Sequence, residues 1–178
     1  MDFEKLLQPL EKSFIQLGYK KISVNNWVCQ TQELIIVLTV NKADTAEKMF
    51  AIGMGIIFKQ IGVGIELKKI SFDYHSHIVQ TLFGILSSMG ESEEYLDKLF
   101  SYDLNDNSGM EVKNISIIMD LYKKKIMPYI KELDERASIV SNFDKKSSWK
   151  PFLEYFVPNQ FNGPFMNRFF FLLTNKVL

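Results

Sequence analysis

The densest group of reactive side chains lies at residues 73–77, which read Asp-Tyr-His-Ser-His and include both histidines of the chain. If a strand continued through this segment, Asp73, His75 and His77 would share one face, because side chains alternate along a strand. Such a group could bind a divalent metal or exchange protons. From Ile78 onward, however, the apolar spacing is helical, and a helix beginning at His77 would point the two rings apart. We therefore favour a structural hydrogen-bonding role, with no bound metal and no cofactor.

The other motifs of enzyme chemistry are absent from the sequence. It contains neither a G-x-S-x-G nucleophile elbow nor a G-x-x-x-x-G-K-[ST] phosphate loop. The pair Gly53 and Gly55 is followed by apolar residues and does not complete a dinucleotide fingerprint. Cys29 follows Val28 in a strand-like pattern, which favours a buried small hydrophobic residue over a thiolate nucleophile. We predict that the chain is not an enzyme.

Charge is segregated along the chain although its sum is zero. One stretch holds six acids against Lys98 alone: Glu91, Glu93, Glu94, Asp97, Asp103 and Asp106. Such a stretch is ordinarily a solvated face, but it can also steer a basic partner, because complementary potentials raise association rates. Three consecutive lysines at 123–125 would spread around a helix and form no compact anion pocket. The acidic stretch is therefore the candidate partner-binding surface.

Length and composition indicate one globular domain spanning residues 1–178. The 21 basic and 21 acidic residues leave no basic excess for nucleic-acid binding. The single cysteine allows no intramolecular disulfide, which fits a reducing compartment. No apolar run approaches the ~20 residues that span a bilayer, and the N-terminus is acidic where a signal peptide is basic. We expect a cytoplasmic protein without a nucleic-acid or membrane partner.

The periodicity of apolar residues changes along the chain and predicts an α+β fold. Residues 3–17 have the three-and-four spacing of an amphipathic helix, with Gly18 suited to its C-terminal cap. From Tyr19 to Tyr74 the period is two, and residues 34–38 are apolar on both faces, as in a central strand. Because the strands follow one another without helices, we predict an antiparallel meander of four to five strands. The C-terminal half is predicted to be helical and packed on this sheet.

Several elements of this scheme carry specific expectations. In the strand over 49–58, large side chains alternate with Ala51, Gly53 and Gly55, so a helix or a ligand can approach that second face closely. A last strand is expected from about Leu67 to His75. Predicted helices then cover the ranges 77–88, 92–100, a long stretch opened by Ser108 and bent at Pro128, and 165–175.

Several short segments of the sequence form a combined pattern: Leu6 to Leu10, Leu17 to Lys21, Asn26-Trp27, the apolar run from Leu34, Asp73 to Ile78, and Leu121 to Leu133 with Pro128. Together they resemble an uncharacterised bacterial family, the domain-of-unknown-function 4304 family. The resemblance covers about residues 3–143 and does not extend to the Phe-rich tail. Residues 41–47 differ from the more regular hairpin connection of the family. It implies an α+β fold and a bacterial origin, and it transfers no catalytic residues.

Three functions remain open at this point. The first is a non-catalytic immunity or antitoxin protein that binds and neutralises a partner toxin, for example a nuclease, through the acidic stretch. The second is a small-ligand binder or enzyme with a groove near Gly53 and Gly55 and with Asp73 and His75 at its rim. The third is a homo-oligomeric structural module. We favour the first, and the sequence does not specify the oligomeric state.

Overall fold

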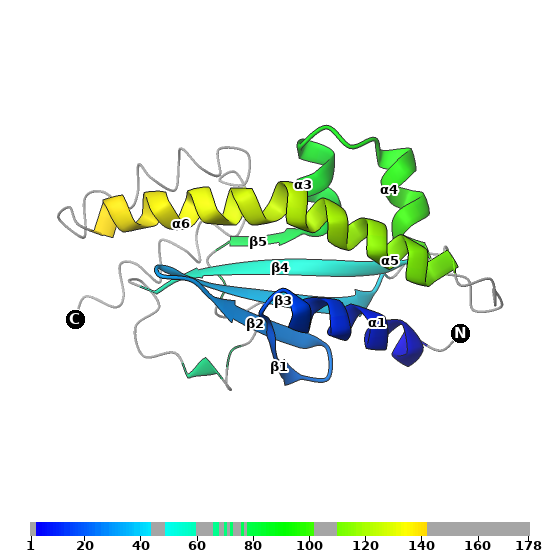
Figure 1. Ribbon diagram of the computed structural model, residues 1–178, viewed down its shortest axis with the longest axis horizontal. Coiled ribbons are helices and arrows are strands. Elements are labelled where there is room, and N and C mark those ends of the chain that lie inside the picture. Colours follow the sequence, from blue (N-terminus) through cyan, green and yellow to red (C-terminus); the bar gives the residue numbers. More distant parts are fainter. Residues whose placement is uncertain are drawn as a thin grey trace.

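The computed structural model describes residues 3–43, 49–59, 66–67, 70, 72, 76, 78–101 and 110–141. The elements follow the chain in this order: α1 (Phe3–Gln16), β1 (Lys20–Ser23), β2 (Asn26–Gln30), β3 (Leu34–Lys42), β4 (Phe50–Phe58), β5 (Ile78–Thr81), α3 (Leu82–Ser88), α4 (Glu93–Phe100), α5 (Met110–Leu121), the π-helix η2 (Tyr122–Ile126) and α6 (Met127–Ser141). In Figure 1, α5, η2 and α6 form one long helix that runs along the sheet. The predicted helix over 165–175 and its turn lie outside the described residues.

The sheet is a five-stranded antiparallel meander in which every strand pairs with the next along the chain. This confirms the predicted α+β fold, with its N-terminal helix and with C-terminal helices packed on the sheet. β3 and β4 pair over their whole length, from Leu34 opposite Phe58 to Lys42 opposite Phe50. Residues 34–40 of β3 are all buried because both faces of the sheet are covered, which is why this segment is apolar at every position up to Leu38.

Helices α1, α3, α4, α5, η2 and α6 pack on one face of the sheet and form the main hydrophobic core with it. α1 buries Leu6, Leu10 and Phe14, and the Phe14 ring lies 5.1 Å from the ring of Trp27 on β2 in an edge-on contact. The predicted helix over 3–17 is thus confirmed. It ends before Gly18, whose φ of 87° is the left-handed conformation that a glycine adopts at little steric cost.

The opposite face has a smaller core formed by Val28, Ile35, Val37, Ile57 and Ile70. Phe72, also from the connection between β4 and β5, packs against it. The apolar residues of that connection therefore cover the face of the sheet that the helices leave open.

The strand predicted from about Leu67 to His75 is wrong at its described residues. Leu67, Ile70 and Phe72 are not in a strand, and β5 lies further along the chain. These residues are apolar because their side chains pack against the sheet. The helix predicted over 77–88 consequently begins five residues late, at Leu82, where Thr81 Oγ1 accepts a hydrogen bond from the backbone N–H of Gly84 at 3.1 Å.

The long helix contains a π-helical turn directly before Pro128. Proline has no N–H to donate, and its ring clashes with the carbonyl four residues earlier, so a regular α-helical turn is disfavoured here. The wider turn bonds the N–H of Met127 to the carbonyl of Tyr122 instead. The long helix buries Ile115, Met119, Tyr122, Ile126, Ile130 and Leu133, whereas Val112 in its first turn is 54% exposed. The predicted cap at Ser108 lies outside the described residues.

Candidate functional site

The candidate surface is built on α4, a short amphipathic helix. Ser92 caps it, because its Oγ accepts a hydrogen bond from the backbone N–H of Tyr95 at 3.3 Å. Its buried face consists of Leu96, Leu99 and Phe100. The Phe100 ring is held between the rings of Phe50 and Phe83, at centroid distances of 5.4 and 5.9 Å.

The outward face of α4 is acidic with one aromatic side chain. Glu93, Glu94 and Asp97 are exposed, and Tyr95 is 39% exposed although it is a large side chain. The two glutamates lie in the first turn, where the positive end of the helix dipole stabilises negative charge. Asp97 lies further along and lacks that advantage. The helix therefore exposes three carboxylates and one tyrosine side chain.

Internal ion pairs distinguish the carboxylates from one another. Glu91 binds Lys125 of η2 at 2.5 Å, and Glu94 binds Lys98 at 2.8 Å across one turn of α4. Within the described part of the chain, Glu93 and Asp97 have no ion-pair partner. They are four residues apart on a helix, where like charges repel by about 0.2–0.5 kcal/mol. These two carboxylates are thus the ones most available to an external cation.

The structure brings four of the six acids of the predicted stretch, Glu91 to Asp97, to α4 and the turn before it. Asp103 and Asp106 lie outside the described residues, so their placement stays a prediction. The same holds for Asp73, His75 and His77. Among the residues that the structure does describe, no three metal-ligating side chains are grouped to hold an ion.

The strip of small residues on β4 is occupied by the chain itself. A Cβ added at Gly53 would lie 2.7 Å from Phe72 Cζ, and one added at Gly55 would lie 2.0 Å from Ser76 Oγ. The predicted close approach to Gly53 and Gly55 is therefore present, made by side chains of the β4–β5 connection. A ligand at this position would have to displace Phe72 and Ser76.

Cys29 is free and half-buried in the helix-side core. Burial raises the pKa of its thiol, while a backbone hydrogen bond with Gln30 acts in the opposite direction. A raised pKa keeps the thiol protonated near neutral pH. This agrees with the interpretation of Cys29 as a small hydrophobic residue.

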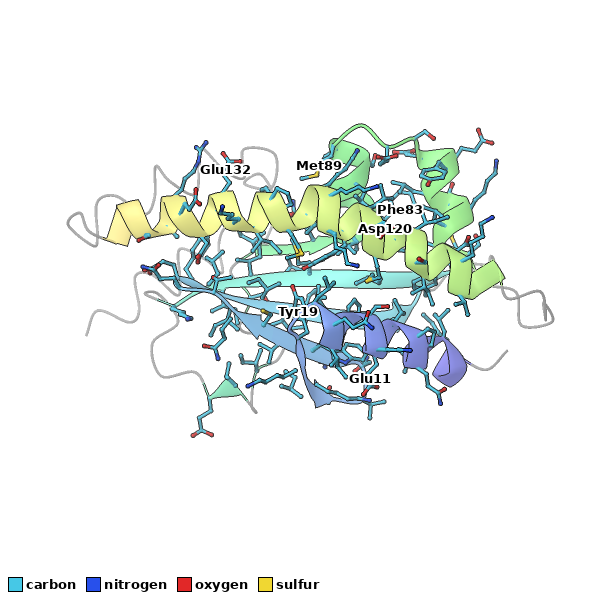
Figure 2. All side chains as sticks on the ribbon, in the orientation of Figure 1. Glu11, Tyr19, Phe83, Met89, Asp120 and Glu132 are labelled. Atoms are coloured by element: carbon cyan, nitrogen blue, oxygen red, sulfur yellow. The ribbon has the colours of Figure 1, made fainter. Side chains whose placement is uncertain are left out.

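A buried polar pair, which no pattern in the sequence predicts, joins the segment between α1 and β1 to the long helix. The hydroxyls of Tyr19 and Tyr122 are hydrogen-bonded to each other, and their rings meet edge-on at 6.4 Å. Desolvation by burial raises the pKa of both hydroxyls, and for Tyr19 the proximity of Tyr122 adds to the effect. Tyr19 is labelled in Figure 2, just after α1. The pair lies in the core and is a structural contact.

A second polar contact ties α6 to the β2–β3 turn. Asp134 Oδ1 accepts hydrogen bonds from Thr31 Oγ1 at 2.5 Å and from the backbone N–H of Glu33 at 2.8 Å. Lys59 donates to the carbonyl of Gln32 at 3.2 Å in the same turn. These charged groups are satisfied by the fold itself and are thus not a candidate site.

No protein-family model, no curated protein and no solved structure matches the chain. No helix in the described ranges is both long and apolar enough to cross a bilayer. The exposed acidic face of α4 is therefore the candidate functional surface.

Proposed function

We propose that this chain is a non-catalytic protein of the immunity or antitoxin type, which binds a basic toxin domain through α4 and neutralises it. The observation that carries this proposal is the exposed pair Glu93 and Asp97, which has no cation partner among the described residues. Membership of the domain-of-unknown-function 4304 family and a cytoplasmic location belong to the same proposal.

The chemistry of α4 fits a cationic protein surface. A nuclease toxin carries lysines and arginines that contact phosphates, so its substrate site is basic. Carboxylates facing such a site raise the association rate, because oppositely charged surfaces attract each other before contact. Tyr95 adds apolar contact area to the charged surface, since partly exposed tyrosines are common contact residues in protein interfaces. A basic partner would also relieve the repulsion between Glu93 and Asp97.

The test uses the chain together with a candidate toxin domain, to be sought among the products of the neighbouring genes. Reversal of both free carboxylates, E93K/D97K, should slow association with that domain by about tenfold or more at low salt, with a smaller effect at high salt. The matched control is E132K/E135K, which changes the net charge equally on the exposed side of α6, away from α4 (Figure 2). Equal association rates for the two variants would refute the role of α4.

Neutralisation itself needs a cellular measurement. Cells that produce the toxin domain should survive when the wild-type chain is also produced, and survival should fall with E93K/D97K. Circular dichroism and urea unfolding of the variant verify that it still folds. Survival that does not depend on the wild-type chain would refute the proposed function as a whole.

A further inference from the structure

The three consecutive lysines of η2 have different environments. Lys123 and Lys124 are exposed, whereas Lys125 is partly buried and points to the connection between α3 and α4. The buried residues Tyr122 and Ile126 fix the backbone of this turn in the core. Lys125 therefore extends from a rigid base.

Lys125 contacts two groups on that connection. Its Nζ lies 2.5 Å from Glu91 Oε1 and donates to the carbonyl of Met89 at 3.3 Å. The two charged side chains are only 31% and 21% exposed. Met89 is the C-terminal cap of α3, so its carbonyl lies at the negative end of that helix, where a cation is favourable. Figure 2 shows Met89 at the end of α3 near the long helix.

The backbone between the two contacts is already tightly turned. Gly90 has a φ of 92°, and the N–H of Glu91 donates to the carbonyl of Leu86 at 3.1 Å. Glu91 directly precedes Ser92, the N-cap of α4. A cation bound to Glu91 therefore determines the position of the first turn of α4.

The far end of α4 has a separate attachment. Asn114 Nδ2 of α5 donates to the carbonyl of Lys98 at 3.1 Å, and Ser101, directly after α4, forms a β-bridge with Met49. With Lys125 at one end and these contacts at the other, α4 is attached to the body of the fold at both ends. Its outward residues are thereby held in a defined orientation.

We infer that Lys125 is a positioning residue, which binds Glu91 and Met89 and so fixes the orientation in which α4 presents Glu93 and Asp97. The inference rests on the proposed function, because orientation matters for binding only if α4 is the docking surface. It assigns Glu91 an internal role and removes it from the group of partner-binding carboxylates.

Amide hydrogen exchange of the full chain without a partner tests the positioning directly. In K125Q, the amides of Leu96 to Phe100 should exchange about two- to fivefold faster than in the wild type, which corresponds to losing an ion pair worth about 0.5–1 kcal/mol. K124Q, an exposed lysine of the same turn, should leave exchange unchanged. K125R, which keeps a cation against Glu91 and Met89, should retain slow exchange. Equal rates in K125Q and K124Q, or a uniform rise that includes β3, would overturn the inference.

The association rate with the toxin domain provides the second measurement. K125Q should slow association by a similar two- to fivefold factor, and K125R should retain the wild-type rate. Faster exchange in α4 without slower association would overturn the positioning role in binding. If the wild-type chain itself did not bind the toxin domain, the proposed function would fail, while the exchange data would still decide whether Lys125 orients α4.

Discussion

Replacement of Gly55 by alanine should destabilise the fold strongly, because the position of the new methyl group is already occupied. The added Cβ would lie 2.0 Å from Ser76 Oγ, 2.9 Å from Ser76 Cβ and 3.1 Å from Phe72 Cδ2. Gly55 is in β4, paired with Val37 on one side and Val79 on the other, so the strand has little freedom to move away. Overpacking of this kind costs about 1–3 kcal/mol.

Urea unfolding followed by circular dichroism measures this cost as a lower midpoint at an unchanged slope. In a domain of this size the melting temperature should fall by about 2–4 °C for each kcal/mol. Because Ser76 supplies the two nearest atoms, the second replacement S76G should recover part of the loss in the double variant G55A/S76G.

The double-mutant cycle separates a specific clash from a general intolerance of β4 to substitution. A favourable coupling of about 1 kcal/mol or more between the two sites is expected, as for residues in direct contact. If G55A unfolded at the wild-type urea concentration, or if the two effects simply added, the close approach of Ser76 to Gly55 would be refuted.

Further predictions concern the buried hydroxyls and the thiol. Y122F should cost about 1–3 kcal/mol in urea unfolding by leaving the hydroxyl of Tyr19 buried without its partner, whereas Y19F/Y122F should cost less. The folded-state pKa values of both hydroxyls are raised above the unfolded value of 10.0. The free energy of unfolding therefore includes their full contribution below pH 10 and loses it as the pH rises further. In Y19F/Y122F the urea midpoint should fall less steeply above pH 10. Cys29 should react with iodoacetamide more slowly at pH 8 in the folded chain than in urea, and equal rates would contradict its burial and raised pKa.

The meander was predictable because its signals are local. The period-two pattern and the doubly apolar run at residues 34–38 indicate which segments pair, and β1 to β4 follow one another with short connections, whereas a longer connection separates β4 from β5. α1 and α4 were predictable for a similar reason, since each combines an apolar stripe with a local capping residue, Gly18 or Ser92.

The region between β4 and α3 was not predictable from the same signals. Ile70 and Phe72 alternate as in a strand, but they are apolar because they cover the sheet. Ile78 and Leu82 have helical spacing, although a strand ends and a helix begins between them. The apolar pattern indicates which side chains are buried. Here the backbone conformation depends on the part of the fold against which those side chains pack.

The composition of the candidate surface was predictable from the sequence, but its ion pairs were not. The acids of α4 are visible in the sequence, but their pairing is not, because Lys125 is far from Glu91 along the chain. The hydroxyl pair of Tyr19 and Tyr122 depends on the tertiary fold in the same way. Contacts between residues so far apart in the sequence can be identified only once the long helix is placed on the sheet.

The separation of those contacts in sequence has a consequence for the order of folding. The pairs Tyr19–Tyr122 and Thr31–Asp134 each join residues 103 apart, whereas every strand pair is between neighbours in the chain. Short-range hairpins close quickly, while distant contacts must wait until the loop entropy between them has been overcome. The sheet should therefore assemble first and the long helix should dock on it late. Replacements at Tyr122 or Asp134 should then accelerate unfolding more than they slow folding.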